Sequence, residues 1–270
     1  MKPIAEALSI SRPHLSSNRE LPARKRGRYT KHEDEALLRR IECIVTERPT
    51  YGYRRVTALL NAGDACAPVN HKRVYRVMKQ TGLLLPKHTG KPERPHDGKV
   101  ITLKSDLRWC SDAFEIRCWN GDRVRVAFSL DCCDREAIAW RGQTAHFSGP
   151  DIEDLMAMSI EARFGATRTP HPVEWLSDNG PPYTAYDTRA FGRAHGLRIR
   201  NTPAYSPESN GMAEAFVKTF KRDYVYLADV SDAETVLRQI DSWFHDYNEN
   251  APHKGLHMRS PRQFRRANES

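Results

Sequence analysis

Residues 108–131 read RWCSDAFEIRCWNGDRVRVAFSLD, and this stretch predicts two β-strands joined by a tight turn. Asn120-Gly121 is a strong hairpin signal, because both residue types accept the positive φ angles that such turns require. After the turn, apolar side chains recur at every second position, which sets them on one face of a strand: Val124, Val126, Phe128 and Leu130. The chain therefore begins an antiparallel sheet here.

Strand and helix patterns alternate downstream of this hairpin. The order β-β-β-α-β-α-β-α-α predicts a mixed α/β sheet with helices on both faces. Asn179 to Pro182 is expected to be a turn. The predicted elements after the hairpin are a strand at 137–141, a helix at 149–164, a strand at 173–177, a helix at 184–195, a strand at 197–201, a helix through Glu214 to about 226, and a helix at 233–248.

Three short amphipathic helices are predicted upstream of the sheet, at about 32–49, 51–60 and 69–80. Asn70 is a good N-cap for the third helix and Gly82 a good stop. Three helices with a basic last one favour a helix-turn-helix that binds DNA, although a basic face can also be merely solvated. The candidate DNA contacts are Arg54, Arg55, Lys72, Arg73, Arg76 and Lys79.

Charge is distributed unevenly along the 270 residues, which carry a formal net charge of +9. Residues 1–100 contain 21 basic and 10 acidic residues, whereas the rest contain 22 and 24. This asymmetry predicts a polyanion-binding module joined to a near-neutral domain. We expect a basic arm at 1–30, a helix-turn-helix domain at 31–85, a linker at 86–103 and the sheet domain at 104–267.

The six cysteines form no C-x-x-C pair, and the sequence has no signal peptide or long apolar run. These features predict a cytoplasmic protein that does not enter a membrane.

Three carboxylates fall at positions suited to metal binding: Asp112 on the first strand, Asp178 at the end of the fourth, and Glu214 in a helix. Such oxygen ligands suit Mg²⁺, and two ions together can drive displacement at a phosphodiester. Lys218 and Lys221 share the helical face of Glu214, so they are expected to bind DNA phosphates rather than to form ordinary surface salt bridges. The opposite stripe is expected to be core rather than a platform for stacking bases: Phe216, Phe220 and Tyr224.

Residues 206–221, SPESNGMAEAFVKTFK, resemble the P-x-S-x-G-x-x-E-x-x-x-K-x-x-K signature of retroviral integrases. With Trp-x-x-Asp at 109–112, Ser-Asp-Asn-Gly at 177–180 and 35 residues between Asp178 and Glu214, the chain looks like a D,D(35)E catalytic core. The blocks at 51–60 and 69–84 are similar to the helix-turn-helix in front of that core in bacterial insertion-sequence transposases. Together with the ending at 247–261, they resemble the second-frame (OrfB) protein of a two-frame insertion sequence.

The resemblance implies a fold and a set of site residues. The fold would be a ribonuclease-H-like mixed five-stranded sheet with flanking helices, preceded by a small all-α helix-turn-helix domain. Asp112, Asp178 and Glu214 would hold two Mg²⁺, for which Mn²⁺ may substitute. Lys218, Lys221 and Asn210 would contact the transposon end. Asp131 matches a family acidic position, which we interpret as structural and hold as the reserve candidate for Asp112.

The implied activity is that of a DDE transposase, which cleaves and then joins DNA strands at the element's ends. The implied partners are terminal-repeat and target DNA, further copies of the chain on DNA, and an upstream-frame protein that is fused by frameshifting or acts alongside. The sequence departs from retroviral integrases, since no His-His-Cys-Cys motif precedes the core and no β-barrel follows it. Two alternatives stay open: a nuclease or resolvase of the same fold without strand transfer, and a non-catalytic DNA-binding regulator.

Overall fold

A computed structural model describes residues 31, 33–62, 67–86, 102–201 and 211–268. The chain divides into two compact units, residues 1–39 and 40–270, and the division falls within helix α3 (Asp34–Glu47). The predicted basic arm at 1–30 and most of the predicted linker lie outside the described residues. None of the helices in the described ranges is both long and apolar enough to cross a membrane.

The three predicted upstream helices are confirmed as α3, α4 (Tyr53–Leu60) and α5 (His71–Gln80). Helix α5 begins where the sequence predicts, because the Asn70 side chain accepts the Lys72 backbone N–H at 2.9 Å. Gly82 follows its end with a φ of +75°, a conformation that glycine adopts without strain. Helices α4 and α5 are in contact, and their apolar faces are buried.

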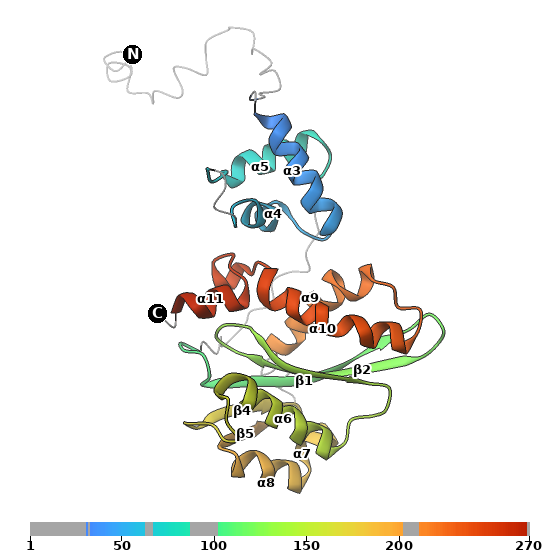
Figure 1. The fold of residues 1–270 in the computed structure, drawn as a ribbon, viewed down its shortest axis with the longest axis vertical. Coiled ribbons are helices and arrows are strands. Elements are labelled where there is room, and N and C mark those ends of the chain that lie inside the picture. The colour runs from blue at the N-terminus through green and yellow to red at the C-terminus, as the bar shows by residue number, and fades with distance from the viewer. Residues whose placement is uncertain (1–30, 32, 63–66, 87–101, 202–210, 269–270) are drawn as a thin grey trace, which may run out of the picture. The chain divides into compact units, whose positions relative to one another are not determined.

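The sheet has five strands in the order β3-β2-β1-β4-β5 (Figure 1), as the resemblance implied. They are β1 (Arg108–Arg117), β2 (Arg123–Asp131), β3 (Ala137–Gln143), β4 (Val173–Ser177) and β5 (Leu197–Asn201). The first three strands are antiparallel, and β4 and β5 run parallel to β1. The predicted hairpin turn between β1 and β2 is confirmed, and Gly121 adopts a φ of +95° there.

Helices cover both faces of this sheet (Figure 1). Helix α6 (Gly149–Phe164) lies on one face, and α9 (Gly211–Asp223) with α10 (Ala233–Asn250) lies on the other. Because neighbouring side chains of a strand point to opposite faces, Trp109 joins the α6 side of the core and Cys110 joins the α9 side. The predicted core stripe of α9 is confirmed, since Phe216, Phe220 and Tyr224 are buried against β1, β2 and α10.

The turn predicted over residues 179–182 was wrong at its two prolines, whereas the helix predicted at 184–195 is confirmed to within two residues at each end. The turn expected over Pro181 and Pro182 is instead the start of helix α7 (Pro181–Thr184), and a separate helix α8 (Tyr186–Ala194) follows. Proline suits the first turn of a helix, because the N–H that it lacks would have no partner there. Ala185 then adopts an extended ψ of 140°, which divides the two helices. The sequence also gave no signal for two 3₁₀ turns, at Val225–Leu227 and Lys254–Leu256, nor for helix α11 (Pro261–Asn268).

Candidate active site

Two of the three predicted carboxylates lie at the ends of neighbouring parallel strands. The register pairs Trp109 with Trp175 and Cys110 with Leu176. Parallel strands advance in step, so two residues further on Asp112 comes opposite Asp178, just past the end of β4. Strand β4 pairs with β1 only from Arg108 to Cys110, so β1 has no partner from β4 beyond that point. The two carboxylates therefore flank an opening in the sheet.

Glu214 approaches the same place from the first turn of α9, which packs on β1. The electrostatics of Asp112 reflect this convergence. Burial, together with the negative charges of Asp178 and Glu214, raises the pKa of Asp112 to about 6, against one hydrogen bond from the Ala113 N–H that lowers it. Three carboxylates from two strands and a helix thus act on one another across a small region.

Each aspartate is held by its surroundings. Asp178 Oδ1 accepts the Gly180 N–H at 3.0 Å, and the Asp178 carbonyl accepts from the Asn201 side chain at 3.0 Å. On the Asp112 side, the buried hydroxyls of Ser111 and Tyr183 share a hydrogen bond of 3.1 Å, which joins β1 to α7. Burial raises the pKa of Tyr183, and the charges of Asp112 and Asp178 add to that rise. Sequence reasoning missed this tyrosine because it assigned its helix to a turn.

The donor set suits a hard cation. All three groups are carboxylates, the ligands that Mg²⁺ prefers, and their repulsion would be relieved by positive charge placed between them. Within the described ranges, no three histidine, cysteine, aspartate or glutamate side chains are already arranged around a metal position. In this structure the three proposed ligands accept hydrogen bonds from nearby donors instead. Glu214, for example, accepts from Lys218 Nζ at 3.5 Å.

The two lysines of α9 differ in their surroundings. Lys218 is 78% exposed and pairs only weakly with Glu214. Lys221 is half-buried, with Nζ 5.5 Å from the centre of the Phe114 ring, and partial burial lowers its pKa. Both lie on the Glu214 side of the helix, as predicted. Asn210, the third predicted contact on this segment, lies outside the described residues.

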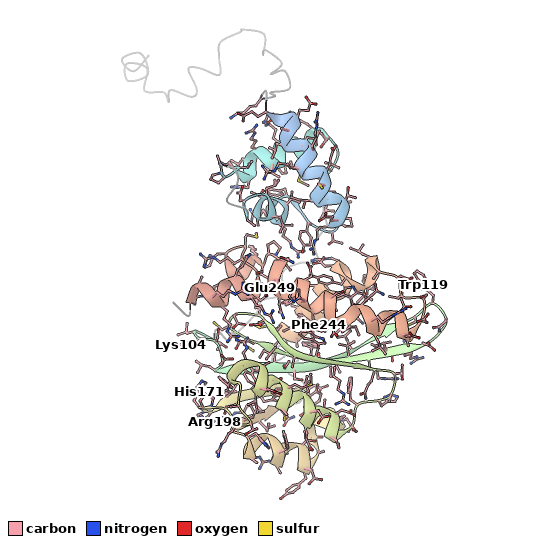
Figure 2. The ribbon with its side chains drawn as sticks, viewed as in Figure 1. Lys104, Trp119, His171, Arg198, Phe244 and Glu249 are labelled. Atoms are coloured by element: carbon pink, nitrogen blue, oxygen red, sulfur yellow. The ribbon has the colours of Figure 1, made fainter. Side chains whose placement is uncertain are left out.

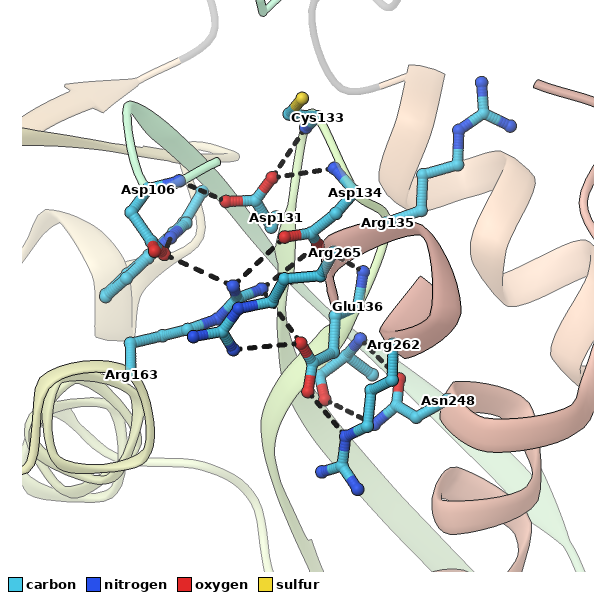
Figure 3. A network of polar contacts seen from close by, with 12 residues as sticks. Asp106, Asp131, Cys133, Asp134, Arg135, Glu136, Arg163, Asn248, Arg262 and Arg265 are labelled. Atoms are coloured by element: carbon cyan, nitrogen blue, oxygen red, sulfur yellow. Dashed lines mark hydrogen bonds and ion pairs between the residues drawn. The ribbon is translucent and has the colours of Figure 1, made fainter. Parts of the chain in front are cut away.

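Asp131, the reserve candidate, occupies a different environment (Figure 3). Its buried carboxylate accepts the backbone N–H groups of Asp106 at 2.7 Å, Cys133 at 2.7 Å and Asp134 at 3.0 Å. Burial and the charge of Asp134 raise its pKa. Asp134 in turn binds the buried guanidinium of Arg163. Asp131 therefore closes the turn after β2, which fits the structural role expected for it.

The predicted contacts on the upstream helices are only partly available to a ligand. Lys72 and Lys79 are exposed on α5, Arg54 is exposed on α4, and Arg73 and Arg76 are half-buried. Arg55 is already engaged within the chain, because it donates to Asp223 at 2.8 Å and its guanidinium lies 3.5 Å from the centre of the Tyr51 ring.

Comparisons with known proteins identify the domains of the chain. Residues 103–207 and 195–261 each match a family model described as "Integrase core domain", and residues 31–91 match one described as "HTH-like domain". A chain of the simian T-cell lymphotropic virus intasome, solved in complex with PP2A regulatory subunit B56 gamma, is similar in fold. The TM-score is 0.52 at 13% identity, over 84% of this chain and 74% of that one. The fold and the matched family models thus define an integrase-type polynucleotidyl transferase with an HTH-like domain in front of it.

Two curated relatives give the family. Transposase InsD for insertion element IS2A/D/F/H/I/K of Escherichia coli is 47% identical over 246 residues, which are 89% of this chain and 82% of the relative. Transposase InsD for IS2-9 of Escherichia coli strain K12 is also 47% identical, over 80% of its length. The chain belongs to this family of insertion-element transposases, and its role is catalytic, in DNA transposition.

Proposed function

We propose that this transposase hydrolyses one DNA strand at each end of its insertion element and then joins the freed 3′-hydroxyl to target DNA. Asp112, Asp178 and Glu214 would hold two Mg²⁺, for which Mn²⁺ may substitute. When bound, the ions activate the attacking oxygen and stabilise the leaving one. The observation that carries the proposal is the strand register, which brings Asp112 opposite Asp178, while Glu214 lies on the helix that packs on β1.

The protein's own residues would hold and orient the DNA. Lys218, exposed one turn after Glu214, would bind a phosphate at the entrance, and Lys221 another one deeper along the helix. Asn210 would add a contact to the element's end. The Gly180 N–H holds the Asp178 carboxylate, and the hydrogen bond between Ser111 and Tyr183 fixes the strand beside Asp112, so only side-chain adjustments would be needed to bring the ligands around a metal.

The finer setting also belongs to this proposal. Two ends must meet for joining, so we expect at least a dimer on DNA, either as a frameshift fusion to an upstream-frame protein or acting with it. Lys72, Arg73, Arg76 and Lys79 would contact DNA from α5, and Arg54 from α4. Arg55 would need to leave Asp223 to take part. The place of action would be the nucleoid of the bacterial cytoplasm.

The decisive experiment uses a labelled oligonucleotide of the element's terminal repeat with Mg²⁺. Asp178→Asn and Glu214→Gln should each lower hydrolysis and joining by about a hundredfold or more, because each removes a negatively charged ligand that would hold the metal ions. Asp187→Asn, at an exposed carboxylate on the nearby helix α8, is the matched control and should keep full activity. Retained activity in either site variant contradicts the proposed metal site. Hydrolysis without joined product supports the nuclease alternative instead.

A further inference from the structure

Two large aromatic side chains stand in solvent on the α9 side of the core. Trp119 is 72% exposed at the end of the β1–β2 hairpin, and Tyr226 is 73% exposed in the 3₁₀ turn after α9. Figure 2 shows Trp119 at the outer end of the sheet. Two large aromatic side chains exposed next to each other indicate a binding surface, because apolar area in water is costly unless a ligand covers it. Neither residue belongs to the site described above.

A cavity of about 520 Å³ lies beside these two rings. This volume falls within the range of pockets that take small ligands. Its wall combines the end of β1, the end of α9 and the segment after it: Glu115, Ile116, Arg117, Trp119, Lys221, Val225, Tyr226, Ala228 and Val230. The lining is therefore aromatic and apolar with charged groups at the margin.

The wall is fixed by backbone hydrogen bonds. The Trp119 N–H donates to the Val230 carbonyl at 2.9 Å, and the Asn120 N–H donates to the Ser231 carbonyl at 3.2 Å. These bonds tie the hairpin end to the segment that follows Tyr226. Both rings are thus presented by rigid backbone, which reduces the entropy cost of binding a ligand.

Within the cavity lining, the cations Arg117 and Lys221 outnumber the carboxylate Glu115, whereas Asp122, Asp229 and Asp232 lie in the neighbouring turns. Glu115 is surrounded by Arg117 at 3.2 Å, Arg123 at 3.6 Å and Arg125 at 3.5 Å, so three cations meet one carboxylate. Lys221 is the second cation of the lining, with its Nζ 5.5 Å from the centre of the Phe114 ring. Aromatic faces beside an excess of positive charge are the features that bind single-stranded nucleic acid.

The cavity lies along a line that starts at the proposed active site. From Asp112 to Arg117 the strand advances about 16 Å, and from Glu214 to Lys221 the helix advances about 10 Å. The two elements run in the same direction, because Glu214 acts on Asp112 at one end and Lys221 lies over Phe114 further on. At about 3.4 Å per stacked nucleotide, this span corresponds to roughly three to five nucleotides.

We propose that this cavity binds one unpaired base of the DNA strand that leaves the active site. Trp119 and Tyr226 contact the base, and Lys221 with Arg117 binds the flanking phosphates. The inference rests on the proposed function for the choice of DNA as ligand. It adds a subsite that would hold the strand in position through a base that is not paired.

Binding of a test strand measures this directly. The full chain, in EDTA, is titrated with labelled oligothymidylate and with an abasic oligonucleotide of the same length, which keeps the phosphates and lacks the bases. The Kd for the abasic strand divided by the Kd for oligothymidylate reports how much the bases contribute to binding. Trp119→Ala and Tyr226→Ala should each lower that ratio about fivefold or more. Tyr186→Ala, at a residue 82% exposed on α8, is the matched control and should leave it unchanged.

A second readout locates the base. Oligothymidylate carrying one 5-iodouracil should photocrosslink to Trp119 or Tyr226, as peptide mapping would identify. An unchanged Kd ratio in both variants, or crosslinks that map only elsewhere, overturns the subsite. An unchanged ratio with altered sedimentation of the free protein would mark a protein interface and overturn it too. If Asp178→Asn retained cleavage, the proposed function would be wrong. The Kd ratio and the crosslink are measured without metal, so they would still test whether the cavity binds a base.

Discussion

Asp112 is the residue at which the proposed metal binding and the stability of the fold would oppose each other. Its carboxylate is half-buried beside the charges of Asp178 and Glu214, and its pKa rises to about 6. A folded-state pKa above the unfolded value means that the protonated form is favoured by folding. The associated stability is complete below about pH 4 and is lost as pH rises through about 6. At neutral pH the ionised site therefore weakens the fold.

Asp112→Asn should accordingly stabilise the metal-free protein at pH 8, while removing activity. We expect a gain of about 2 kcal/mol in the free energy of unfolding, after allowance for partial solvent exposure. Thermal melts in EDTA at pH 4 and pH 8 measure it, and the difference between variant and wild type should appear only at the higher pH. Added Mg²⁺ should stabilise the wild type more than the variant. A variant less stable at pH 8 would show that Asp112 does not carry this repulsion.

Some residues of the site could be predicted from the sequence and others could not. Asp178 and Glu214 stand in distinctive local motifs, and the register then brought Asp112 opposite Asp178. Tyr183 and Asn201 hold the site through contacts between segments distant in sequence, which a local pattern cannot reveal. The engagement of Arg55 by Asp223 also depends on a residue far along the chain.

At the scale of elements, the connection from α8 to β5 depends on one glycine. Gly196 has a φ of +91°, and a Cβ built there would lie 2.3 Å from Thr169 Oγ1. Both the conformation and the close approach exclude a side chain. The connection therefore brings β5 into the sheet in the correct position beside β4, whose pairing with it begins at Leu197.

Gly196→Ala should destabilise the protein by about 2–3 kcal/mol, through backbone strain together with the contact at Thr169. Gly165→Ala is the matched control, since Gly165 also has a positive φ, of +59°, but a Cβ there would meet nothing within 4 Å. That variant should lose only about 1 kcal/mol. Chemical denaturation of both proteins gives the comparison. Equal losses would mean that Thr169 moves aside without cost.

Elements were predicted well where one local rule dominates. Alternating apolar residues and Asn120-Gly121 located β1 and β2, and the Asn70 cap located the start of α5. Pro181 and Pro182 were assigned wrongly because proline serves turns and first helical turns alike. Helix α11 is short and largely polar, and it is held by ion pairs from Arg262 and Arg265 to the distant Glu136.

At the scale of the whole molecule, DNA binding should depend on salt through the basic residues of the helical segment. Lys72→Ala combined with Lys79→Ala, both exposed on α5, should weaken DNA binding uniformly across sequences. The slope of log K against log salt should fall by about 2, because each phosphate that a cation no longer neutralises lowers the slope by about 0.9. Arg198→Ala, on an exposed position of β5, is the control and should change the slope little. An unchanged slope in the double variant would remove α5 from the DNA-binding surface.

Strand β1 has a genetic consequence. Between Trp109 and Trp119 it carries a core tryptophan, the aspartate proposed for catalysis and the end of the hairpin. Side chains alternate between faces with a period of two, so deletion of one codon between those of Trp109 and Asp112 would turn the aspartate toward the wrong face. Every downstream motif would remain readable in such a copy. Such a copy of the element would look intact by its motifs but would be inactive. The number of residues between Trp109 and Asp112 would distinguish it from an active copy.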